Sequence, residues 1–122
     1  MFKKILMIGL LLFTTSVTAE NRPWTTEERT WGWAAGALLL GDWLTTRNMT
    51  QRYNEGYYER NPVLGRYPTT QQVNRHFLVS IPLVFLIADH WQSQRKHWLM
   101  GITIIEAAAV ANNLSIGLRI QY

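Results

Sequence analysis

Three apolar stretches, each with a single acidic residue, constrain the fold of this 122-residue chain more than any other feature. They lie at residues 30–46, 76–91 and 98–118. A helix of about 20 apolar residues can cross a bilayer, and these stretches reach or approach that length. We therefore predict an all-α fold, a small helical membrane bundle in which three helices follow an N-terminal signal sequence.

Local signals agree with three helices. Thr25 lies three residues before Glu28, which is the spacing of a capping box at a helix start, and Thr69 precedes Gln72 in the same way. Pro82 falls inside the second stretch, where a membrane helix tolerates a kink. Because neither Gly nor Pro separates the second stretch from the third, two alternatives stay open. The chain turns at 92–97, or residues 70–111 form one long helix.

The N-terminus has the organisation of an export signal. Lys3 and Lys4 precede an apolar run at 5–13, and small residues end the segment at Ala19. This run is short for a membrane anchor, so we expect a signal peptide at 1–19, cleaved after Ala19. A single domain at 20–122 would remain. The alternative is an uncleaved first helix.

The arginines indicate a topology. Residues 47–75 form a polar segment, which we predict to be a cytoplasmic turn because positively charged loops stay inside. Its arginines are Arg47, Arg52, Arg60, Arg66 and Arg75. The opposite turn holds only Arg95 and Lys96. We therefore expect the bacterial inner membrane as the location and the lipid bilayer as a partner. A periplasmic bundle would bury the same apolar faces and is the alternative.

Acidic residues within apolar stretches are the candidates for chemistry, because a charge inside a membrane is costly and usually faces a partner. These residues are Asp42, Asp89 and Glu106. The candidate acid–base groups are Asp42 and Glu106 together with Glu59, which lies in the polar segment and would have to fold back to meet them. The simpler interpretation, which we favour, is a polar seam that holds the helices in register. In the third stretch Thr103, Glu106 and Asn113 share one helix face.

Metal and nucleic acid are poor candidates as ligands. On one helix His90 and His97 would lie about 10 Å apart, too far to share a metal ion. We expect no metal site and no cofactor. Glu55 and Glu59 dilute the arginines and tyrosines of the polar segment, so we also expect no nucleic-acid partner.

One combination of motifs is familiar. D-W-L-T-T at 42–46 is followed by E-R-N-P-V-L-G at 59–65, and then by Pro68. With Glu106 and Asn113, this order resembles a group of small bacterial membrane proteins of phage and prophage type whose function is uncharacterised. The likeness covers about residues 30–120. The positions that match are Asp42, Thr46, Glu59, Asn61, Pro62, Gly65, Glu106 and Asn113.

The resemblance implies a setting more than a mechanism. We expect a non-enzymatic envelope protein that acts through helix contacts with itself or with a host membrane protein, for example in superinfection exclusion. In this interpretation Thr46, Asn61, Pro62, Gly65, Thr103 and Asn113 are structural. The alternatives are an intramembrane enzyme that uses the buried carboxyl groups and a holin-like pore.

Overall fold

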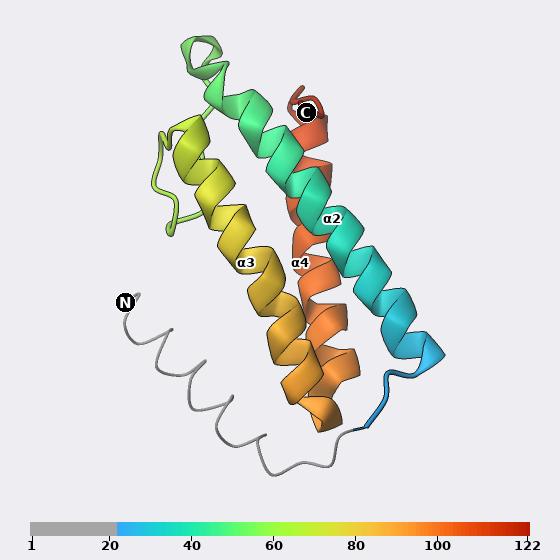
Figure 1. The fold of residues 1–122 in the computed structure, drawn as a ribbon. Coiled ribbons are helices and arrows are strands. Elements are labelled where there is room, and N and C mark those ends of the chain that lie inside the picture. Colours follow the sequence, from blue (N-terminus) through green and yellow to red (C-terminus); the bar gives the residue numbers. More distant parts are fainter. Residues whose placement is uncertain (1–21) are drawn as a thin grey trace.

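The computed structural model describes residues 22–122, and all regular secondary structure in this part of the chain is helical (Figure 1). Its long helices are α2 (Thr26–Thr50), α3 (Thr70–His90) and α4 (Arg95–Ser115). Two short 3-10 turns, η1 (Tyr53–Glu55) and η2 (Gln92–Gln94), lie in the connections. The all-α prediction with three helices is thereby confirmed. The predicted signal peptide at 1–19 lies outside the described residues.

Both predicted capping boxes start their helices. The backbone N–H of Glu28 donates to Thr25 Oγ1 over 3.1 Å, and the N–H of Thr25 donates to the Glu28 carboxylate over 2.9 Å. Thr69 and Gln72 make the same reciprocal pair at the start of α3. Each pair satisfies two backbone donors that a helix start leaves without a partner. The predicted polar turn at 47–75 is shorter in the structure, because α2 continues to Thr50 and α3 begins at Thr70.

The chain turns between α3 and α4, so the alternative of one helix over residues 70–111 is wrong. Neither Gly nor Pro makes this turn. The backbone leaves helical geometry at Trp91, with φ −90° and ψ 64°. The Arg95 side chain then folds back and donates to the carbonyl oxygens of Ala88 (2.8 Å) and Asp89 (3.1 Å). These carbonyls belong to the last turn of α3, where no intrahelical donor is available. An arginine at the start of α4 therefore caps the helix before it.

The helices form one bundle in which α2 and α4 run in the same direction and α3 runs opposite to both (Figure 1). α2 packs against each of the other two. Apart from one phenylalanine, the buried apolar side chains are aliphatic: Ala35, Leu39, Met49, Val73, Phe77, Val84, Ala88, Leu99 and Leu118. Polar side chains share this interior, namely Glu28, Thr45, Thr46, Arg95 and Thr103.

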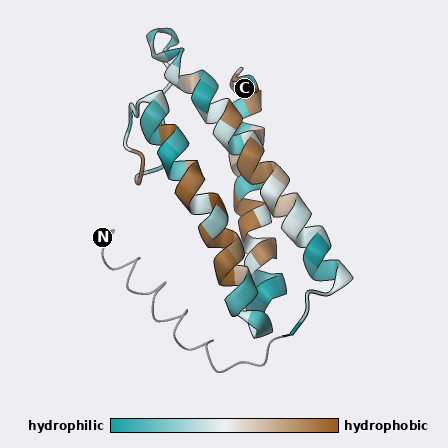
Figure 2. Cartoon of the chain, in the orientation of Figure 1, coloured by the Kyte–Doolittle hydropathy of each residue, from teal (hydrophilic) through white to brown (hydrophobic). Residues whose placement is uncertain are grey.

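Hydropathy varies along the bundle axis. The hydrophobic residues are concentrated in the middle of the helices, and hydrophilic residues gather at both ends (Figure 2). In residues 22–122, however, no helix combines the length with the mean hydropathy that crossing a membrane requires. The prediction that this bundle is a membrane bundle is therefore unsupported by that measure.

Candidate functional site

Asp42 is the centre of a polar cluster between α2 and α4. Its carboxylate accepts hydrogen bonds from Thr46 Oγ1 (3.1 Å) and from Asn113 Nδ2 (3.2 Å). Asn113 Nδ2 also donates to the buried hydroxyl of Thr45 over 2.9 Å. Thr46 lies one turn after Asp42 on α2, whereas Asn113 comes from α4. The cluster therefore joins the two parallel helices.

Glu106 brings a second carboxyl group into this cluster. Its carboxyl group lies close enough to that of Asp42 for the two to interact. A hydrogen bond between two carboxyl groups needs a proton on one of them, because an ionised carboxylate only accepts. Glu106 Oε2 is buried without a hydrogen-bond partner among the described residues. One proton shared by the two carboxyl groups would join them, whereas two ionised groups would repel each other.

Glu59 approaches the cluster from the connection between α2 and α3. Its carboxylate accepts from the backbone N–H groups of Arg60 (2.8 Å) and Asn61 (2.9 Å). Burial raises the pKa of Glu59, these two hydrogen bonds lower it, and the charge of Asp42 raises it again. The net pKa lies above the usual 4.5. The connection therefore folds back until Glu59 lies within electrostatic range of Asp42.

The N-P-V-L-G part of the motif forms a turn. Asn61 Oδ1 accepts from the N–H of Val63 over 3.0 Å, and the Asn61 carbonyl accepts from the N–H of Gly65 over 3.2 Å. Gly65 has a φ of 80°, in the left-handed region that favours glycine. Just outside the turn, the N–H of Glu59 donates to the carbonyl of Arg66 over 2.8 Å and closes the loop. Asn61 and Gly65 shape the segment that presents Glu59, while Pro62 is exposed within it.

The structure therefore brings some predicted site residues together and not others. Asp42, Thr46, Glu106 and Asn113 form one cluster, with Glu59 near it. Thr103 is buried, but its hydroxyl donates to the carbonyl of Leu99 in its own helix over 2.7 Å. Among the described residues, no group of three His, Asp or Glu side chains is close enough to hold a metal ion.

Sequence reasoning missed a second buried cluster at the opposite end of the bundle. Glu28 Oε2 lies 2.8 Å from the Arg22 guanidinium, and Glu28 Oε1 lies 3.3 Å from that of Arg95. Arg95 is 1% exposed, although its charge suggested a solvent-exposed turn. One signal was available. A cation is unfavourable at the first position of a helix because the helix dipole is positive there. Such a residue needs a nearby acid or carbonyl groups, and Arg95 has both.

Comparison with protein-family models, with curated proteins and with solved structures finds no match to the chain.

Proposed function

We propose that this protein is a bundle embedded in the bacterial inner membrane that acts through helix contacts and not through catalysis. The observation that carries the proposal is the apolar surface in the middle of the bundle. Large apolar side chains are exposed there, while polar and charged side chains are buried beside the apolar core. Exposing large apolar side chains to water is unfavourable. In lipid the same exposure carries no penalty, whereas a polar group facing lipid is costly.

Each helix contributes to the apolar outside. Leu78 on α3 is 62% exposed and Ile104 on α4 is 64% exposed. The exposed apolar residues in the middle of the helices are Trp33, Leu40, Leu78, Val79, Leu83, Leu86, Ile104 and Ile105. Contiguous exposed apolar surface of this kind marks contact with a membrane or with another protein.

The polar inside explains how a bundle can suit lipid when its separate helices have modest mean hydropathy. A mean over a whole helix counts residues that face inward, whereas lipid meets only those that face outward. Asp42, Glu106 and Asn113 lower the mean, yet they bond to one another between α2 and α4. In a membrane such residues face the bundle interior, as these do.

The ends of the bundle fit the same setting. Tyr58, Tyr67 and Arg66 are exposed in the connection between α2 and α3, and the Arg66 guanidinium lies 4.7 Å from the centre of the Tyr58 ring. Tyrosines and arginines are favoured where the bilayer meets the cytoplasm. The resemblance to phage and prophage proteins adds the role in the envelope, such as exclusion of a second phage.

An intramembrane enzyme is the second candidate, because the Asp42 and Glu106 carboxyl groups interact and Glu59 lies nearby. Two interacting carboxyl groups of different proton affinity are the usual pair for acid–base chemistry. We favour a structural role because Asn113 of α4 donates to both Asp42 and Thr45 of α2, and Thr46 holds the Asp42 carboxylate within α2.

Membrane fractionation tests the proposal. The protein is expected to stay in the membrane after a carbonate wash and to need detergent for dispersal. Reporters at residues 55 and 122 should both be active in the cytoplasm. Release by carbonate with solubility in plain buffer, or a reporter at 55 active only in the periplasm, would contradict it.

Substitution of the carboxyl groups separates the two candidates. Asp42→Asn, Glu59→Gln and Glu106→Gln each remove an ionisable group and keep the side-chain shape. A structural seam predicts less folded protein or a lower melting temperature for the Asp42 and Glu106 variants than for Glu27→Gln, a matched change at an exposed ion pair. Unchanged folding with a lost cellular phenotype would favour the enzyme.

A further inference from the structure

A groove of about 600 Å³ runs along α2 beside Phe85 of α3. Apart from one arginine, its lining is apolar or glycine. The lining residues are Trp24, Arg29, Gly32, Trp33, Gly36, Ala37, Leu40 and Phe85. The volume is in the range of small-molecule sites, and an almost wholly apolar wall suits a hydrocarbon ligand.

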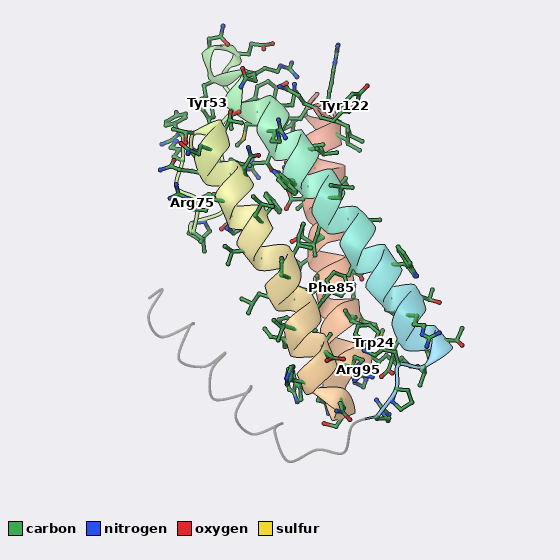
Figure 3. All side chains as sticks on the ribbon, in the orientation of Figure 1. Trp24, Tyr53, Arg75, Phe85, Arg95 and Tyr122 are labelled. Carbon is green, nitrogen blue, oxygen red and sulfur yellow. The ribbon has the colours of Figure 1, made fainter. Side chains whose placement is uncertain are left out.

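Glycines and fixed aromatic rings create the groove. A Cβ atom at Gly32 would lie 3.1 Å from the Trp24 ring, and one at Gly36 would lie 3.4 Å from Phe85. Trp24 is held in place, because its Nε1 donates to Asp89 over 3.1 Å and the Arg95 guanidinium lies 4.9 Å from its ring centre. Figure 3 shows Trp24 and Phe85 beside α2, with Arg95 below them. One wall of the groove, the Trp24 ring, is therefore held in place by contacts with α3 and α4.

Arg29 gives the groove a charge at one end. At this end of the bundle Arg22 and Arg95 pair with Glu28, and Lys96 pairs with Glu27 at 2.9 Å. The exposed Arg29 side chain has no such partner within residues 22–122. A cation without a counter-ion at the mouth of an apolar groove complements a ligand with an anionic head and a hydrocarbon tail.

We propose that the groove binds one acyl chain of an anionic phospholipid whose phosphate contacts Arg29. This inference rests on the proposed function, because it places the groove in a bilayer. From Arg29 to Leu40 a helix rises about 16 Å, close to half of the roughly 30 Å hydrocarbon core. Trp33, which is 82% exposed, lies one turn from Arg29, at the depth that tryptophan favours.

Native mass spectrometry of the purified full chain tests the site, with phosphatidylglycerol and phosphatidylcholine of the same acyl chains as probes. The wild type should retain one phosphatidylglycerol in preference to phosphatidylcholine. Arg29→Gln should reduce that preference about fivefold, the effect of one cation near an anionic headgroup. Arg75→Gln, an exposed arginine at the other end of the bundle, is the matched control.

A second variant tests the tail. Ala37→Leu adds bulk inside the groove and should lower retention of both lipids, whereas Ala108→Leu, at an exposed alanine on α4, should not. Equal retention of the two lipids, or unchanged retention in Arg29→Gln and Ala37→Leu, would overturn the site. The site would also be overturned if the wild type formed a dimer that Ala37→Leu dissociates, because the groove would then hold a second copy of the chain. If the wild type stays in the membrane after a carbonate wash but shows no lipid preference, only this inference fails. If the wild type is released by carbonate and is soluble in plain buffer, the proposed function fails.

Discussion

Two buried clusters of charged or ionisable side chains join α2 to α4, and they balance charge in opposite ways. In the cluster at the start of the helices, Glu28 lies between the guanidinium groups of Arg22 and Arg95. In the other cluster, Asp42 meets a second carboxyl group, Glu106, together with the Asn113 amide. The acid of the first cluster is paired with cations, whereas the second cluster brings one carboxyl group against another.

This difference gives the two clusters different roles, one in the stability of the fold and the other in possible acid–base chemistry. An acid held between two arginines is fixed in its charged state and is a poor proton carrier. Two interacting carboxyl groups are suited to accepting and releasing a proton. This cluster also buries Glu106 Oε2 without a hydrogen-bond partner among the described residues, which is costly. Hence the cluster around Glu28 should dominate stability, and the cluster around Asp42 is the only one of the two suited to a reaction.

Removing Arg95 is expected to have the largest effect. Arg95→Met leaves Glu28 buried with one cation fewer and leaves the carbonyls of Ala88 and Asp89 without their donor. Breaking a buried ion pair in this way costs about 3–5 kcal/mol. Thermal unfolding of the purified protein, followed by circular dichroism, measures the loss.

Lys96→Met is the control for that experiment, since its ion pair with Glu27 is exposed and should contribute less than about 1 kcal/mol. Arg95→Lys keeps the charge but loses the bridging geometry and should lie between the two. Equal melting temperatures for Arg95→Met and Lys96→Met would show that the buried cluster around Glu28 stabilises the fold no more than the exposed pair of Lys96 and Glu27.

Truncating Asn113 should have an intermediate effect. Asn113→Ala removes the donor to Asp42 and to Thr45, and the loss of hydrogen bonds to buried groups costs about 1–3 kcal/mol. Urea unfolding of this variant beside Asn112→Ala, whose exposed side chain makes no hydrogen bond within residues 22–122, isolates the effect. If both substitutions lower the free energy of unfolding equally, the hydrogen bonds of Asn113 do not stabilise the contact between α2 and α4.

Acid should produce the smallest change, and it should act through Glu28. Burial alone raises the pKa of Glu28, but the hydrogen bond from Thr25 and the charges of Arg22 and Arg95 outweigh it, so that the pKa lies below the usual 4.5. Because the folded state favours the charged form, this stability is present above about pH 4.5 and is lost as the pH falls through the lower folded value.

Melting temperatures measured as the pH is lowered from about 5 to 3 check this sign. Glu28→Gln should flatten the acid dependence. Glu55→Gln, which breaks the exposed pair of Arg52 and Glu55, should flatten it less. An unchanged slope in Glu28→Gln would place the acid sensitivity elsewhere.

Local sequence signals determined where α2 and α3 begin, but not where α3 ends and α4 begins. Thr25 and Thr69 mark helix starts because their hydroxyl groups, with an acid or amide three residues later, satisfy backbone donors of the same short segment. Asn61 and Gly65 marked a turn for equally local reasons. The spacing of Thr103 and Asn113 also placed both on the face of Glu106, but it could not show that the Thr103 hydroxyl would bond within its own helix.

Only the tertiary structure decided which charges meet. Arg95 is the first residue of α4 and looks like a surface residue in the sequence, yet it caps α3 and pairs with an acid 67 positions earlier. Asp42 finds its partners on α4 because α2 and α4 run in the same direction at matching heights. Such pairs depend on how whole helices pack. A hydrogen bond within one turn is set by neighbouring residues, but a contact between distant residues exists only after the bundle has formed.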